Sequence, residues 1–379
     1  MRPLRPASLV ATASVAAALA VTAAVSPLPA ASAHETHRHD VGAVFVQNDD
    51  PAGNTIVAYA RSAAGRLRES GRYATGGRGG VLAGSVVDHL ASEGSLGFDD
   101  GLLVAVNAGS DTITTFAVDG DRLTRRQILP AGGEFPVSVA MHDGKVFVLD
   151  ARGGGAIQGF RRTGDRLVLV PAWHRDLGLD PDQTPEFTST PGQVGFTPDG
   201  RRLLVTTKNG SNAVLVYGLG RRGLAQTPVT TRLPGAVPFG FAFDRRGVLA
   251  LTEAGTNTVA TFRVARDGRL AALDSAATGQ AATCWAVVSR HRVYASNAGS
   301  ATLSAYRVGH DGVLTDNGRT PTGAGTVDAA ASRDGRFLYA QTGAAGKVDA
   351  FRVGRDGSLR QVDSVTVPNG AGGEGIVAR

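Results

Sequence analysis

Four residues have side chains suited to acid–base chemistry on a small ligand: Glu253, Lys208, His89 and Glu93. Glu253 and Lys208 each end an apolar, strand-like segment, nine residues before an aromatic residue. A carboxylate there is a candidate general base, and an ammonium group can offset the charge of a carboxylate. His89 and Glu93 are four residues apart, so a short helix would place them on one face as an acid/base pair.

The same strand-end position is occupied by Asn107 and Asn297 in other segments. If these ends meet at one mouth of a ring, they form a polar ligand-binding set together with Lys208 and with Gln193, which opens another strand. Two alternatives remain open. Asn side chains also cap their own loops through bonds to the backbone, and the segment that carries His89 and Glu93 also suits a structural plug.

An internal repeat in the sequence predicts the strands that would position these residues. Seven aromatic residues recur at spacings of 44 or 45 residues, with two longer spacings of 57. This period matches four strands per propeller blade, and inserts at 71–93 and 171–191 account for the longer spacings. The seven residues are Tyr59, Phe116, Phe160, Tyr217, Phe262, Tyr306 and Phe351.

The repeat predicts an all-β fold, a seven-bladed propeller of four-stranded blades. The first repeat lacks its inner strand, and a strand-like segment at 375–379 supplies it. We therefore expect the C-terminal strand to pair with the N-terminal strands and close the ring, because closure removes exposed sheet edges. Inner strands are predicted at 95–98, 137–141, 193–196, 239–243, 285–288, 328–331 and 375–379.

Residues 1–33 have the pattern of a secretory leader. Arg2 and Arg5 precede an apolar stretch, and Ala31-Ser32-Ala33 is a small-x-small cleavage site. We expect cleavage near Ala33, a secreted protein, a mobile His-rich tail over 34–42 and the propeller over 43–379. No later stretch is long and apolar enough to span a bilayer.

Composition narrows the possible partners. The formal net charge is +6, without a Lys/Arg run interleaved with aromatics, so we expect no nucleic-acid partner. Cys284 is the only cysteine, which excludes an intramolecular disulfide. The histidines at 34, 37 and 39 could bind a metal weakly, but a mobile tail is the preferred interpretation. We predict a monomer that has no metal or cofactor and binds a small molecule.

The repeats resemble the lactonase-type propeller family, which includes bacterial 6-phosphogluconolactonase and fungal carboxymuconate cyclase. The carrying segments are Thr197-Pro198-Asp199-Gly200-Arg201, the run 253–259, and repeated Arg-Asp-Gly-x-Leu turns. The family's proposed active residues are a His and an Arg that each follow a Pro, and a Glu that ends a strand. The resemblance places that Glu at Glu253. At the other two positions this sequence has Pro136-Val137 or Pro191-Gly192, and Pro238-Phe239.

The resemblance implies binding, and possible hydrolysis or isomerisation, of a small lactone or carboxylate at one channel mouth. In an enzyme, Glu253 would be the general base, His89 or Glu93 would assist with protons, and Lys208 would offset the carboxylate charge. A phosphorylated sugar lactone is a cytoplasmic metabolite, so we expect an unphosphorylated one. The alternative is a non-catalytic extracellular binding scaffold.

Overall fold

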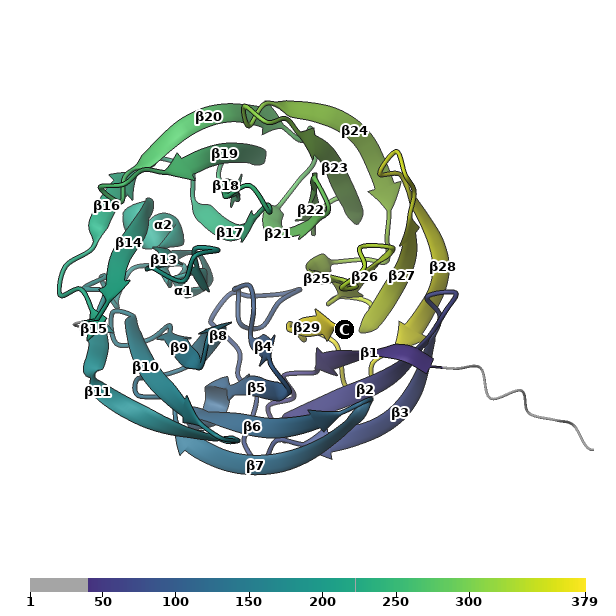
Figure 1. Cartoon of the computed structure of the whole chain (residues 1–379), viewed down its shortest axis with the longest axis horizontal. Coiled ribbons are helices and arrows are strands. Elements are labelled where there is room, and N and C mark those ends of the chain that lie inside the picture. The colour runs from purple at the N-terminus through teal and green to yellow at the C-terminus, as the bar shows by residue number, and fades with distance from the viewer. Residues whose placement is uncertain (1–39, 222) are drawn as a thin grey trace, which may run out of the picture. The chain divides into compact units, whose positions relative to one another are not determined.

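The computed structural model describes residues 40–221 and 223–379, and this part of the chain forms seven antiparallel sheets arranged in a ring (Figure 1). Strands are given from the inner one outward. Blade 1 consists of β29 (Ile376–Ala378), β1 (Asp40–Gln47), β2 (Thr55–Ser62) and β3 (Leu67–Ala74), and blade 2 of β4 (Leu96–Asp99), β5 (Leu102–Asn107), β6 (Thr112–Asp119) and β7 (Arg122–Pro130). Blade 3 consists of β8 (Pro136–His142), β9 (Lys145–Asp150), β10 (Ala156–Thr163) and β11 (Arg166–Asp176).

Blade 4 consists of β12 (Gln193–Phe196), β13 (Arg202–Thr206), β14 (Ala213–Gly220) and two short outer strands, β15 (Gly223–Leu224) and β16 (Val229–Arg232). Blade 5 consists of β17 (Pro238–Phe243), β18 (Val248–Glu253), β19 (Thr258–Val264) and β20 (Leu270–Ala277), and blade 6 of β21 (Thr283–Ser289), β22 (Arg292–Asn297), β23 (Thr302–Val308) and β24 (Leu314–Pro321). Blade 7 consists of β25 (Thr326–Ala331), β26 (Phe337–Thr342), β27 (Lys347–Val353) and β28 (Leu359–Thr366). Short helical turns occur at η1 (Ala108–Ser110), α1 (Glu186–Ser189) and α2 (Lys208–Ser211).

The predicted seven-bladed fold is confirmed, and so is the way its ring closes. β29 pairs antiparallel with β1, with Phe45 opposite Val377, and Figure 1 shows the C-terminus beside β1 on the inner side of the ring. Blades 7 and 1 are also joined by side chains. The Tyr59 hydroxyl donates to the Thr366 carbonyl at 2.9 Å, and the Tyr339 hydroxyl donates to the Gly65 carbonyl at 3.2 Å.

The repeated aromatic residues all lie on the third strand of a blade and are buried. In six blades the register between the third and fourth strands shifts beside this aromatic, as between Ala58 and Tyr59 or between Thr261 and Phe262. A bulge increases the local twist and bend of a strand. The period found in the sequence therefore marks the place where the outer strand of these six blades bends.

The two inserts are shorter than the sequence suggested, because the fourth strands extend into them. β3 continues to Ala74, so the first insert covers residues 75–95. β11 continues to Asp176, so the second covers 177–192. β1 begins at Asp40, three residues before the expected start of the propeller. The predicted leader and most of the predicted tail lie outside the described residues. In the part of the chain that the structure describes, no helix is long and apolar enough to cross a membrane.

Candidate functional site

The first insert crosses the centre of the ring and is bonded to three other blades. The Trp285 indole donates to the Ser92 carbonyl at 2.6 Å, and the Ser92 hydroxyl donates to the Val137 carbonyl at 2.8 Å. The Glu93 amide donates to the Gly192 carbonyl at 3.0 Å, and the Ser138 hydroxyl donates to the Glu93 carbonyl at 2.7 Å. These bonds reach blades 3, 4 and 6, so the insert occupies the channel as a plug.

Residues 88–93 are bends and irregular backbone, so His89 and Glu93 do not share a helical face. Asp88 holds the turn, because its carboxylate accepts bonds from the amides of Leu90 and Ser92 at 2.8 and 2.9 Å. The helix that would have paired His89 with Glu93 is absent, since these local bonds favour a tight turn.

Glu93 is buried against blades 5 and 6. Its Oε2 accepts a bond from the Ala286 amide at 3.0 Å. A Cβ on Gly240 would lie 1.8 Å from that same oxygen, so only glycine leaves room for it. Burial raises the pKa of Glu93 well above its usual range, and nearby Asp328 raises it further. The side chain therefore caps the inner edge of a blade.

His89 is half-buried and packs on blade 7. Its amide donates to the Gly372 carbonyl at 2.8 Å, and a Cβ on Gly372 would lie 2.1 Å from its Nε2. Burial lowers the pKa of His89, so the ring is neutral at pH 7. Its Nδ1 is buried and makes no hydrogen bond within the described residues. His89 thus has one ring nitrogen that the protein does not use.

Lys208 is buried and makes three hydrogen bonds within the protein. Its ammonium donates to the carbonyls of Ala91 and Phe187 at 2.7 and 2.5 Å, and to the Thr190 hydroxyl at 3.0 Å. It also lies 5.3 Å from the centroid of the Phe239 ring. Burial lowers the pKa of Lys208 to about 7, against the opposing effect of Asp88. This side chain holds both inserts against blade 4.

Glu253 lies at the end of β18. Its carboxylate is partly exposed, and Oε2 accepts a bond from the Thr258 hydroxyl at 2.6 Å. Among the described residues, no hydrogen bond or ion pair joins Glu253 to the other three. Glu93 belongs to the first insert and Lys208 is hydrogen-bonded to that insert. Glu253 lies on blade 5 and is oriented by the Thr258 hydroxyl.

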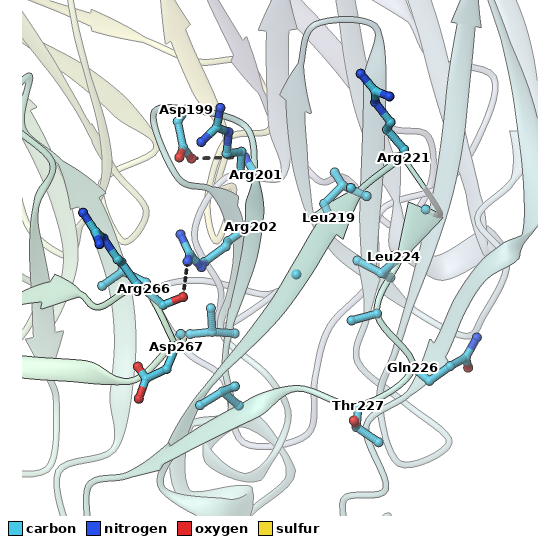
Figure 2. A pocket seen from close by; sticks show the side chains of 18 residues that line it. Asp199, Arg201, Arg202, Leu219, Arg221, Leu224, Gln226, Thr227, Arg266 and Asp267 are labelled. Carbon is cyan, nitrogen blue, oxygen red and sulfur yellow. Dashed lines mark hydrogen bonds between the residues drawn. The ribbon is translucent and has the colours of Figure 1, made fainter.

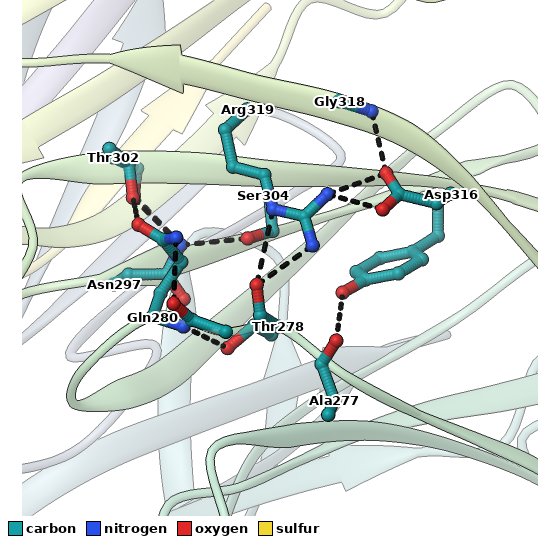
Figure 3. Close-up of polar contacts among 11 residues, drawn as sticks. Ala277, Thr278, Gln280, Asn297, Thr302, Ser304, Asp316, Gly318 and Arg319 are labelled. Atoms are coloured by element: carbon teal, nitrogen blue, oxygen red, sulfur yellow. Dashed lines mark hydrogen bonds and ion pairs between the residues drawn. The ribbon is translucent and has the colours of Figure 1, made fainter.

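Asn107 and Asn297 are held within the fold mainly by side-chain hydroxyls, and within the described residues only Asn297 also donates to the backbone of its own loop, at the Thr302 carbonyl at 3.3 Å. The Asn297 amide donates to the hydroxyls of Thr302 and Ser304 at 3.1 and 2.9 Å and accepts a bond from the Thr283 hydroxyl at 2.7 Å (Figure 3). Asn107 is buried and donates in the same way to Thr112 and Thr114. The donors of both amides are used within the fold.

Gln193 is half-buried on the inner strand of blade 4. Its Oε1 accepts a bond from the Phe241 amide at 2.5 Å. The residue lines a cavity of about 360 Å³ that the inner strands of blades 3, 4 and 5 surround, with Phe196 and Phe243 among its walls. Gln193 is therefore placed beside a cavity, and its own oxygen is engaged in joining two blades.

The comparisons with known proteins agree with this architecture. A family model described as "Lactonase, 7-bladed beta-propeller" matches residues 248–375. A putative 6-phosphogluconolactonase from Bacteroides fragilis superposes with a TM-score of 0.71 at 18% identity, covering 91% of this chain and 99% of the other. The periplasmic gluconolactonase of Pseudomonas aeruginosa gives a TM-score of 0.71 at 18% identity, covering 89% and 98%. No curated protein matches the sequence.

The resemblance to the lactonase-type propeller family is confirmed. Pro136 and Pro238 open β8 and β17. The residues after these prolines, Val137 and Phe239, are buried and apolar. No charged side chain therefore stands at either position, whereas Glu253 falls within the matched segment.

Sequence reasoning missed a set of buried carboxyl groups around the plug. Glu374 accepts bonds from the amides of Gly94 and Ser95 at 2.7 and 3.3 Å, and its own amide donates to Asp49 at 2.7 Å. Asp328 accepts a bond from the Ile376 amide at 3.2 Å. These acids satisfy backbone N–H groups that the inner strand edges and the insert turn toward the channel.

Burial raises the pKa of each of these acids, to about 8 for Asp49, to about 7 for Asp88 and to about 6 for Asp328. The pKa of Glu374 also rises well above its usual range, through burial and the neighbouring carboxyls. Within the described residues, no group of three or more His, Cys, Asp or Glu side chains is arranged to hold a metal ion. No sequence signal marked this set, because its members come from strand ends and an insert outside the repeat.

Proposed function

We propose that this chain is an exported hydrolase of an unphosphorylated lactone, with Glu253 as its general base. The observation that carries the proposal is the state of Glu253. Its carboxylate is partly exposed and fixed by the Thr258 hydroxyl at 2.6 Å, whereas Glu93 and Lys208 are buried and bonded within the protein. Glu253 also lies within the segment that matches the lactonase family model.

The reaction needs one base and one water molecule. Glu253 accepts a proton from the water as its oxygen attacks the lactone carbonyl carbon. The ring C–O bond then breaks, and the departing alkoxide oxygen takes that proton. The product is a hydroxy acid, which releases a proton to solvent near pH 7. The neutral His89 ring and the plug that Glu93 and Lys208 anchor are proposed to shape the ligand site above the channel.

Export supports the choice of an unphosphorylated substrate. The leader-like pattern of residues 1–33 directs the chain out of the cytoplasm, away from phosphorylated sugar lactones. A solved structure with the same fold is described as a periplasmic gluconolactonase. We therefore place sugar lactones without a phosphate group first among the candidate substrates, ahead of aromatic-acid lactones.

The test is proton release, followed by pH-stat, from the purified protein with sugar and aromatic lactones. Glu253→Gln is expected to lower the rate by about 10²–10⁴-fold, the usual contribution of a general base. The matched control is Glu134→Gln, an exposed glutamate in the loop before β8. Thermal melting of both variants separates lost catalysis from lost folding.

The alternative function is a non-catalytic binding scaffold. It is favoured by the apolar residues after Pro136 and Pro238, where the family has a His and an Arg. Absence of turnover on every lactone, or equal rates for the folded Glu253→Gln variant and the unmodified protein, would refute the hydrolase and leave the scaffold.

A further inference from the structure

A large basic hollow lies between blades 4 and 5, among the hairpin turns of these blades. Its volume is about 1250 Å³. Pockets for small molecules usually measure about 300–1,000 Å³, so this hollow has room for more than one small ligand unit. Figure 2 shows Arg201, Arg202 and Arg266 gathered on one side of it and Arg221 on the other.

The hollow exists because the outer edge of blade 4 is incompletely covered. β16 pairs only with Ala213–Val216 of β14, and the two-residue β15 pairs only with Leu219 and Gly220. In the flanking blades, the outer strands β11 and β20 have 11 and 8 residues. The segment 225–228 leaves the sheet in blade 4, which opens a space that a full outer strand fills elsewhere.

Most of the arginines that line the hollow have N–H donors that make no hydrogen bond within the described residues. Arg202 donates to the Arg266 carbonyl at 2.7 Å. The guanidinium groups of Arg201, Arg221 and Arg266 are exposed, and none makes a hydrogen bond or a close ion pair within the described residues. Asp199 does not neutralise Arg201 by direct contact, because its carboxylate accepts bonds from the Thr197 hydroxyl and the Arg201 backbone amide at 2.6 and 3.1 Å.

Blade 7 shows what the same turn does when its arginine is used internally. Its Asp-Gly-Arg turn pairs Arg336 with Asp334 at 2.6 Å. The Asp-Gly-Arg turn of blade 4 leaves the Arg201 guanidinium unpaired. The difference concentrates free cationic donors at blade 4, beside the uncovered sheet edge.

A second hollow of about 480 Å³ continues this basic surface toward blade 3. It shares Leu219, Gly220, Arg221 and Gly223 with the first, and adds Arg161, Arg162 and Lys145, of which Lys145 pairs with the lining residue Asp143 at 3.4 Å. We call the two hollows together the rim groove. Cationic side chains follow it from blade 3 to blade 5, so its ligand is expected to be an elongated polyanion.

The walls of the rim groove indicate which polyanion fits. Ala225, Val229 and Val264 line the hollow, are partly exposed and give it apolar walls among the arginines. Such walls suit the C–H faces of sugar rings, which a polyphosphate lacks. Single-stranded nucleic acids are bound largely through aromatic side chains on which their bases stack. The one aromatic residue of the groove, Trp173, is 6% exposed, and its ring lies against Phe147.

We propose that the rim groove binds a segment of an acidic polysaccharide. The carboxylates along the chain pair with Arg201, Arg221 and Arg266, and the sugar rings rest on the apolar walls. A guanidinium group offers five N–H donors in a fork that matches a carboxylate. This binding is independent of lactone hydrolysis, because none of its residues is shared with Glu253 or with the plug.

The experiment measures fluorescence anisotropy of a fluorescein-labelled oligogalacturonate titrated with the purified protein at low ionic strength. The variant is Arg201→Ala combined with Arg266→Ala. The matched control is Arg333→Ala combined with Arg355→Ala, which removes two exposed arginines from the corresponding turns of blade 7. We expect at least about tenfold weaker binding for the first variant, with an unchanged melting temperature and weaker binding at high salt. The control is expected to bind as the unmodified protein does.

Three results would overturn the proposal. The first is no binding of the labelled oligogalacturonate. The second is an equal loss in both double variants, which would indicate attraction by net charge alone. The third is stronger competition by polyphosphate or DNA than by unlabelled oligogalacturonate, which would assign the groove to a different polyanion. Neutral dextran is expected not to compete.

Discussion

At the scale of single residues, Lys208 shows how much of a side chain's role can be predicted from its residue type and its position in a strand. The sequence places it at the end of a strand, beside the expected mouth, and there it was predicted to offset the charge of a ligand. The structure gives it a φ of 46°, which non-glycine residues rarely adopt. Its ammonium is bonded to Ala91, Phe187 and Thr190. A backbone angle and a distant insert decide its role, and neither can be derived from the strand that carries it.

Replacing Lys208 by Met tests whether its role is structural. The carbonyls of Ala91 and Phe187 would lose their donor, and a buried acceptor left without a partner costs about 1–3 kcal/mol. We expect a lower melting temperature and faster proteolysis of residues 75–95. Lys347→Met is the control, because Lys347 is exposed on β27. Lys208→Met melting like the unmodified protein would contradict the anchoring role.

At the scale of elements, the ring depends on three residues at the end of the chain. β29 joins the sheet of β1 through the pairs Val44–Ala378, Phe45–Val377 and Val46–Ile376. This pairing could be predicted, because the sequence holds seven inner strands only if the C-terminal segment is counted with the first repeat. The plug could not be predicted in the same way, since residues 75–95 belong to no repeat and their contacts lie on several blades that are distant in the sequence.

Ending the chain at Gly373 is expected to destabilise the whole propeller. The change removes β29, leaves the edge of β1 unpaired and exposes the surface that buried Ile376 covers. Burial of such a side chain alone contributes about 1.5–3 kcal/mol. Urea unfolding followed by circular dichroism measures the loss. The full-length Glu374→Gln variant is the control, because it keeps the strand. Equal midpoints for the truncated and intact chains would refute the closure.

At the scale of the whole molecule, the fold was more predictable than the chemistry for a physical reason. Each blade must bury the same kind of apolar surface against its neighbours, so the same sequence pattern occurs seven times, with residues such as Tyr59 and Phe351 at corresponding positions. The channel is asymmetric. Its acids satisfy different backbone groups: Glu93 accepts a bond from blade 6, and Glu374 accepts bonds from the end of the first insert. A single occurrence leaves no pattern in the sequence.

The buried acids make the stability of the whole propeller depend on pH. An acid whose pKa is higher in the folded than in the unfolded state binds more protons when folded, so stability falls as pH rises through the folded pKa. For Asp49 this range runs from 3.8 to about 8. Asp88, Asp328, Glu93 and Glu374 act in the same direction. The lowered pKa of Lys208 acts oppositely, but only above about 7.

We therefore expect the free energy of unfolding to fall as pH rises from about 4 to about 7, by up to about 1.4 kcal/mol per pH unit for each proton. Asp49→Asn should flatten this fall, because the amide oxygen can still accept the bond from the Glu374 backbone amide and the side chain has no proton to lose. The control is Asp199→Asn, which removes a carboxyl group whose pKa is lowered, first by the bond from the Thr197 hydroxyl. That group is ionised in both states above about pH 5, so the slope there should persist. Urea midpoints measured across this range check both variants, and a stability that rose with pH in the unmodified protein would mean that the channel acids are ionised and otherwise compensated.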